Sequence, residues 1–162
     1  MAKKSVVSRN FNLDSYWDTI DIDSGLAVGS VVGLIPISQY CLVQTVLAFV
    51  MKEAVGTGAA TVVVGDADDA DGFLLSQDLK VSKSQLYGND PDDLGKYLKL
   101  IRPYDGSYSE LTPFTPHEQL MGKFYTADTN IRVVTTIATA AATTAGKVRV
   151  WVKLLQLMTR ED

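Results

Sequence analysis

The sequence predicts an all-β fold: an antiparallel β-sandwich, jelly-roll-like, with about eight strands. Short segments rich in Val, Ile, Thr and aromatic residues recur along the chain, and clusters of Gly, Asn, Asp and Pro separate them. Helical patterns are confined to two short segments, residues 92–99 and 116–120. An immunoglobulin-like sandwich is the alternative fold, because hydrophobic periodicity does not separate it from a jelly roll.

Each expected strand is bounded by turn residues. The expected strands cover residues 16–22, 26–37, 39–51, 61–64, 73–75, 96–101, 123–126, 130–138 and 147–158. Gly29 and Gly33 interrupt the second of them, which predicts a bulge or a close backbone approach. The sequence ADTN at 127–130 predicts a hairpin-like turn.

The residue patterns of two long expected strands indicate which of their faces are buried. Strand 39–51 is apolar on both alternating faces, so it needs cover on both sides, from the sandwich or from a neighbouring subunit. One of its predicted faces consists of Cys41, Val43, Leu47 and Phe49. The closing strand alternates basic or aromatic side chains with apolar ones, which predicts one exposed face and one core face. That core face consists of Val148, Val150, Val152 and Leu154.

The length of 162 residues predicts a single sandwich domain, residues 13–162. A polar segment with three basic side chains precedes it, and we expect residues 1–12 to form an extended N-terminal arm. Apolar residues make up 46% of the chain and charged residues 21%, which excludes general disorder.

Composition also limits the partners. The net charge of −4 comes with no wide basic region, so we expect no nucleic-acid partner. The basic start lacks the apolar segment of a secretory signal, and no apolar run reaches the roughly 18 residues of a spanning helix. We therefore expect no membrane partner and synthesis in a cytoplasm. The single cysteine, Cys41, excludes an intrachain disulfide and is predicted to be a small buried apolar residue.

The sequence VVVGDADDADGFL, residues 62–74, contains four aspartates: Asp66, Asp68, Asp69 and Asp71. An EF-hand loop that began at Asp66 would need a ligand at position 5 and glycine at position 6, where this chain has Ala70 and Asp71. We therefore predict a hydrated turn between strands, with no metal and no other cofactor. A looser calcium site built from Asp66, Asp68 and Asp71 is the alternative.

No pattern predicts a catalytic residue. His117 is the only histidine, and neither a GxSxG turn nor a glycine-rich phosphate loop occurs. Four adjacent aspartates on one exposed loop also lack the apolar pocket that a glycosidase acid requires. We expect a protein that is not an enzyme; a hydrolase or lyase on a β-sandwich is the alternative class.

Aromatic side chains outside the expected core are candidates for an interface. A tyrosine-rich region follows the middle of the chain, and a second aromatic group lies near the N-terminus. The interface candidates are Phe11, Leu13, Tyr16, Trp17, Tyr104, Tyr108 and Phe114. The simpler interpretation of the tyrosine-rich region is that it packs over one end of the sandwich; the alternative is a platform for a sugar.

Three runs resemble small virion structural proteins of tailed bacteriophages. They are VLAFV, GTGAATVVVGDADDADGFL and KFYTADTNIRVVTTIATAAATTAGKVRVWVKLLQL, which fall between about Leu42 and Leu157 with a divergent middle from about Ser76 to Leu120. The resemblance implies a jelly-roll or β-sandwich module that decorates or cements a capsid, commonly as a trimer. It marks no catalytic residue.

The resemblance implies the following expectations. The chain is a capsid decoration protein that stabilises the head shell as a homotrimer, and its partners are itself and the major capsid protein or other virion proteins. Its location is the virion, assembled in the host cytoplasm. The alternative is a tail, neck or head-fibre component whose loops contact a host glycan. A calcium-binding module is a further alternative.

Overall fold

Two antiparallel β-sheets pack face to face in the computed structural model, which describes residues 14–81, 84–88, 90, 92–98 and 122–156. Within these ranges the chain forms strands and turns and no helix. No helix in this part of the chain is long and apolar enough to cross a membrane. The predicted antiparallel sandwich is therefore confirmed, while the jelly-roll connectivity stays a prediction. The expected arm, residues 1–12, lies outside the described residues.

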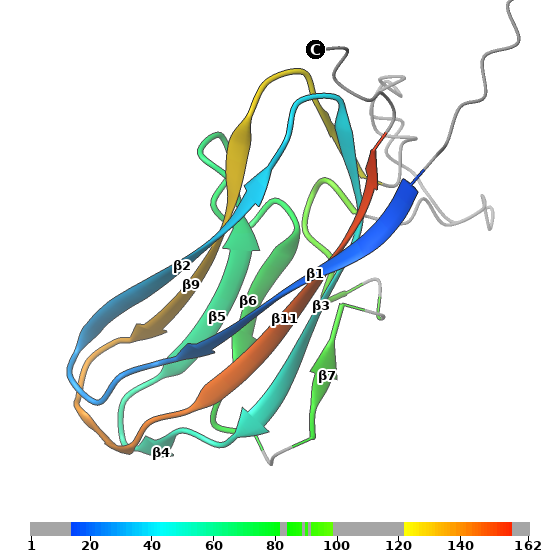
Figure 1. Ribbon diagram of the computed structural model, residues 1–162. Helices are drawn as coiled ribbons and strands as arrows, with labels where there is room; N and C mark the ends of the chain where they lie inside the picture. Colours follow the sequence, from blue (N-terminus) through cyan, green and yellow to red (C-terminus); the bar gives the residue numbers. More distant parts are fainter. Residues whose placement is uncertain (1–13, 82–83, 89, 91, 99–121, 157–162) are drawn as a thin grey trace, which may run out of the picture.

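The first sheet has the order β1 (Asp14–Asp23), β11 (Lys147–Gln156) and β3 (Cys41–Lys52). Two short strands share the far side of β3. β8 (Lys123–Tyr125) pairs with its beginning, and β7 (Leu86–Tyr87) pairs with its second half. The first and last long strands of the chain therefore lie side by side (Figure 1).

The second sheet has the order β2 (Gly29–Ile37), β9 (Thr129–Ile137), β5 (Ala60–Gly65) and β6 (Leu74–Asp78). A two-stranded ribbon lies at one end of the molecule (Figure 1). It consists of β4 (Val55–Gly56) and β10 (Ala142–Thr144). The core between the two sheets is a single cluster of buried apolar residues.

The closing strand β11 has the two faces that its sequence predicts. Val148, Val150, Val152 and Leu154 are all fully buried, and the residues between them are partly exposed. The long strand β3 differs from the simple alternation. Cys41 and Val43 are buried on the same side as Val46, Ala48 and Val50, because the register to β11 shifts between Val43 and Thr45. The predicted grouping of Cys41 and Val43 with Leu47 and Phe49 is therefore wrong, whereas burial of Cys41 is confirmed.

β2 contains neither a bulge nor a close backbone approach at its two glycines. It pairs with β9 without a register shift from Gly29 to Ile37, so the bulge prediction is wrong. A Cβ atom at Gly33 would lie 2.6 Å from the Ile20 Cδ1 atom, so Gly33 makes room for a side chain of β1 and not for backbone. A Cβ atom at Gly29 would meet nothing within 4 Å.

Three local predictions fail in the described part. Residues 92–98 form turns with one isolated bridge from Leu94 to Leu74, so neither a helix at 92–99 nor a strand starting at Lys96 is present there. Residues 127–130 do not close a hairpin, because β8 belongs to the first sheet and β9 to the second. The second helix prediction, 116–120, lies outside the described residues.

The edge strand β2 exposes apolar side chains and carries no charge. Its side chains Val32 and Leu34 are 46% and 54% exposed, and the chain contains no charged residue from Ser24 to Met51. Val32 begins a row of three valines across the outer face of the second sheet, continued by Val134 in β9 and Val63 in β5. Edge strands of soluble proteins are usually protected from pairing with other chains by charges or proline; β2 has Pro36 near its end but no charge.

Candidate functional site

Asp66 is the buried centre of a polar cluster at one end of the sandwich. It follows β5 directly, and its side chain is 2% exposed. The Oδ1 atom accepts hydrogen bonds from the backbone N–H groups of Asp68 and Asp69, each at 3.0 Å. This local capping is the reason that aspartate is favoured at the first position of such turns. The prediction of a hydrated turn is therefore wrong for Asp66.

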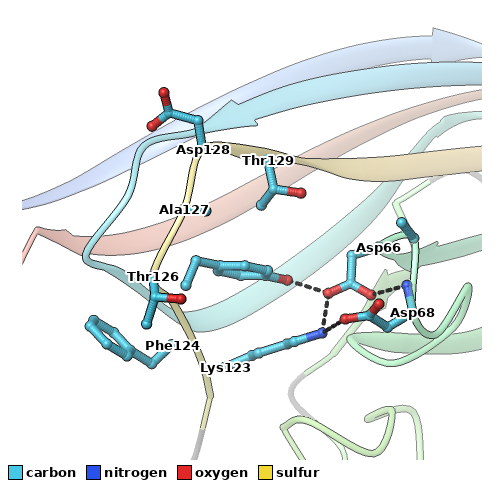
Figure 2. Close-up of a pocket in the computed structure, with 10 residues that line it drawn as sticks. Asp66, Asp68, Lys123, Phe124, Thr126, Ala127, Asp128 and Thr129 are labelled. Atoms are coloured by element: carbon cyan, nitrogen blue, oxygen red, sulfur yellow. Dashed lines mark hydrogen bonds and ion pairs between the residues drawn. The ribbon is translucent and has the colours of Figure 1, made fainter.

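A strand from the other sheet supplies the partners of Asp66. Lys123 and Tyr125 lie two residues apart in β8, so their side chains point to the same face. The Lys123 Nζ atom lies 2.6 Å from Asp66 Oδ2, and the Tyr125 hydroxyl donates to the same oxygen at 2.5 Å. Figure 2 shows Lys123 between the carboxylates of Asp66 and Asp68. Asp66 thus connects the end of β5 to β8 across the sandwich.

Asp68 and Tyr97 complete the surroundings of Lys123. Its Nζ atom also donates to Asp68 Oδ2 at 2.9 Å and to the Tyr97 hydroxyl at 3.0 Å, and it lies 4.3 Å from the centre of the Tyr97 ring. The Asp68 side chain is 82% exposed, whereas that of Lys123 is 21% exposed. The ammonium group is therefore largely surrounded by oxygens and the Tyr97 ring, although the side chain keeps some exposure to solvent.

Burial and hydrogen bonding act in opposite directions on these groups. Burial would raise the pKa of Asp66, but the hydrogen bonds from Lys123, Tyr125 and two backbone N–H groups outweigh it and lower the pKa. Burial would likewise lower the pKa of Lys123, but its hydrogen bonds to Asp66, Tyr97 and Asp68 raise it. Burial and the adjacent Asp66 carboxylate raise the pKa of Tyr125. At neutral pH the cluster is a carboxylate–ammonium pair with a neutral tyrosine.

Aromatic packing and glycines fix the loop that carries Asp66. Phe73 is fully buried and meets the Tyr97 ring edge-on, with ring centroids 4.9 Å apart. Side chains are excluded at Gly65, where a Cβ atom would collide with the backbone of Asp69 and Ala70, and at Gly72, where it would collide with the Tyr97 ring. The glycines of the GDADDADG sequence are therefore required for close packing.

Lys123 and Tyr125 were not predicted as site residues, whereas Tyr97 belongs to the tyrosine-rich region that was expected to pack over one end of the sandwich, and it packs against Phe73. The alternation in KFY places Lys123 and Tyr125 on one face of a strand, and that was the available signal. The sequence does not show that this face meets Asp66, which is 57 residues away. Contacts between residues this far apart in the sequence become visible only in the folded structure.

The three aspartates of the calcium alternative have different surroundings. Asp66 and Asp68 share Lys123, while Asp71 interacts with Asp69, which raises the pKa of Asp71. Among the described residues no group of three or more His, Cys, Asp or Glu side chains is placed to hold a metal ion. Calcium binding therefore has no support from this geometry.

The interface candidates fall into two groups. Tyr16 and Trp17 lie in β1 and are exposed, as the prediction requires for contact with a partner. Phe11, Leu13, Tyr104, Tyr108 and Phe114 lie outside the described residues, as does His117. The chain leaves the described part after Leu98 and re-enters at Gly122, whose backbone N–H donates to the Tyr97 carbonyl at 2.8 Å.

A shallow polar pocket of about 330 Å³ adjoins the cluster (Figure 2). Asp66, Asp68 and Lys123 line one part of it, and the segment from Phe124 to Thr129 lines the rest. Phe124 is 43% exposed at its rim, and Asp128 accepts a hydrogen bond from the Gln39 backbone. The pocket combines an aromatic surface with carboxylates and hydroxyls.

No protein-family model, curated protein or solved structure matches the chain.

Stability should fall in acid because of Asp66. Its folded-state pKa lies below the ordinary value of 3.8, so the carboxylate stabilises the fold fully above that value, and this contribution is lost as the pH falls through the lowered pKa. We expect the free energy of unfolding, measured by denaturant titration from about pH 7 to about pH 2 on freshly folded protein of full sequence mass, to fall less steeply in Asp66→Asn than in the wild type. Equal slopes would contradict this role.

Proposed function

We propose that this chain is a non-enzymatic structural protein of tailed-phage virions, a decoration protein that stabilises the head shell as a homotrimer. The observation that carries the proposal is the edge strand β2, which is apolar, uncharged and exposed. In a protein that worked as a monomer, such an edge would invite uncontrolled pairing. In a protein that works in an assembly, the edge is covered by its neighbour.

Two further observations support an assembly role. The row Val32, Val134 and Val63 extends the apolar surface across the outer face of the second sheet. In addition, the buried side-chain polar atoms of the described part all have hydrogen-bond partners. The cluster at Asp66 therefore resembles a structural connection, since its charged groups are all bound to one another. The three sequence runs that resemble phage structural proteins agree with this proposal.

The proposal is tested by the mass of the protein in solution and by its binding to capsids. The purified protein should have the mass of a trimer by light scattering and should rebind capsids that lack it. A monomer that does not bind capsids would refute the decoration role.

Charges placed on β2 should break the assembly. We expect a Val32→Lys, Leu34→Lys double variant to behave as a monomer in light scattering, because two ammonium groups would be buried in the interface without partners. Leu75→Lys is the matched control, since Leu75 is an exposed leucine in β6 at the opposite edge of the same sheet. If both variants remained trimers, the interface would not include β2.

The second candidate is a tail, neck or head-fibre component that contacts a host glycan. The observation in its favour is the pocket beside Phe124, because sugar sites combine an aromatic surface with polar groups. Deletion of residues 104–114 would then abolish adsorption to the host and leave particle stability unchanged. Fragile particles with normal adsorption would instead support the decoration role.

A further inference from the structure

The contact between Lys123 and Asp66 places an amine nitrogen against a carboxyl group inside the sandwich. The Lys123 Nζ atom lies 2.6 Å from Asp66 Oδ2, the oxygen next to the Cγ carbon. Lys123 belongs to β8 in one sheet and Asp66 follows β5 in the other. A covalent bond between them would join the two sheets.

The two oxygens of Asp66 are held in different ways. Oδ1 accepts the backbone N–H groups of Asp68 and Asp69, both at 3.0 Å, and two such donors on one oxygen stabilise the negative charge of a tetrahedral intermediate. Oδ2 accepts the Tyr125 hydroxyl at 2.5 Å. One oxygen is thus placed to become the oxyanion and the other to leave as water.

Asp68 supplies a proton acceptor for the amine. Its Oδ2 atom lies 2.9 Å from the Lys123 Nζ atom, within the distance that proton transfer requires. Asp68 and Asp66 share the same ammonium group, so both carboxylates lie within hydrogen-bond distance of the nitrogen that must lose two protons.

We propose that Lys123 and Asp66 form an intramolecular amide bond, from Nζ to Cγ, with loss of one water. Asp68 takes a proton from the ammonium and passes it to Asp66 Oδ2, which makes a free amine and a neutral carboxyl. The amine attacks Cγ, and the charge that develops on Oδ1 is held by the two N–H groups. A second proton moves from nitrogen through Asp68 to Oδ2, the C–Oδ2 bond breaks, and water leaves. Asp68 is regenerated as a carboxylate.

The reaction is a single event within each chain and needs no cofactor. Its rate is limited by the resting ion pair, in which Lys123 is protonated and must first lose a proton to Asp68. The fixed contact removes a different cost, that of bringing the two groups together, because holding two reacting groups in place corresponds to an effective concentration of about 10⁵–10⁸ M in favourable cases. We therefore expect the bond to accumulate with time after folding.

Intact-protein mass spectrometry tests the proposal directly. The full chain, purified and incubated at neutral pH, should become lighter than its sequence mass by the mass of one water. After digestion with trypsin, a branched peptide should join the residues around Lys123 to those around Asp66, and cleavage after Lys123 should be lost. A wild-type chain that keeps its full mass throughout the incubation would refute the proposal.

Two variants test whether Lys123 and Asp68 take part in the loss of water. Lys123→Arg keeps a positive charge beside Asp66 but has no primary amine, so it should keep its full mass. This control also detects dehydration at the Asp71–Gly72 sequence, which would remove water from both proteins and would count against the amide. Asp68→Asn keeps the shape of the side chain without the base, and we expect the bond to form about 100-fold more slowly or slower. An unchanged rate would show that Asp68 is not the base in this reaction.

Discussion

Replacing Asp66 with alanine should destabilise the folded chain by about 3–5 kcal/mol, the usual cost of removing one partner of a buried ion pair. The variant leaves the Lys123 ammonium and the Tyr125 hydroxyl without the oxygen to which both donate. It also removes the acceptor of two backbone N–H groups. The measurement is the free energy of unfolding from denaturant titration. Wild type and variant are both measured directly after folding, on samples that keep their full sequence mass, so that the Lys123 ammonium is present and no amide bond contributes.

Asp68→Ala is the matched control for Asp66→Ala. Both aspartates bind Lys123, but the Asp68 side chain is 82% exposed and its charge is well solvated. An exposed ion pair contributes about 1 kcal/mol or less. Equal losses in the two variants would mean that burial of Asp66 does not determine its contribution.

Phe73→Ala should cost a similar amount, about 3–5 kcal/mol, which is typical of truncating a buried aromatic side chain. Phe73 is among the largest of the fully buried side chains, and its ring supports Tyr97, whose hydroxyl accepts a hydrogen bond from Lys123. The resulting cavity would lie directly beneath the Asp66 loop. Loss of stability by denaturant titration should therefore be accompanied by faster amide hydrogen exchange at residues 66–72.

Phe124→Ala serves as the control for this change. Phe124 belongs to β8, between Lys123 and Tyr125, but it is 43% exposed at the rim of the pocket. A surface substitution of this kind usually changes stability by about 0.5 kcal/mol or less. A large loss in Phe124→Ala would show that the whole of β8, and not the buried packing, controls stability.

Periodicity predicted most long strands because the alternation of apolar residues lies within each strand's own sequence. In β11 the fully buried residues Val148, Val150 and Val152 alternate with partly exposed ones, and this pattern is visible without the fold. In β3 the alternation of buried residues changes phase after Val43, because the register to β11 shifts there, and that shift depends on the partner strand. The turn at 127–130 was misassigned for a related reason: a tight turn does not show whether the next strand stays in the same sheet.

The Asp66 cluster was beyond prediction because its members are distant in sequence. Four aspartates in one loop were treated as equivalent, yet Asp66 is buried and Asp68 is exposed. The difference arises from Lys123 and Tyr125, which a strand of the opposite sheet brings to one aspartate more closely than to the others. A sequence shows how many carboxylates a loop has, whereas the fold determines which of them is neutralised.

The backbone hydrogen bond from Gly122 to Tyr97 determines where this chain can accept insertions. The described chain leaves the sandwich after Leu98 and re-enters it at Gly122, and this hydrogen bond places the two points side by side. Since the entropy of closing a connection rises only slowly with its length, the number of residues between these two points can change at little cost to the described strands. The connection is therefore the natural place for inserting a foreign peptide while the two sheets stay the same.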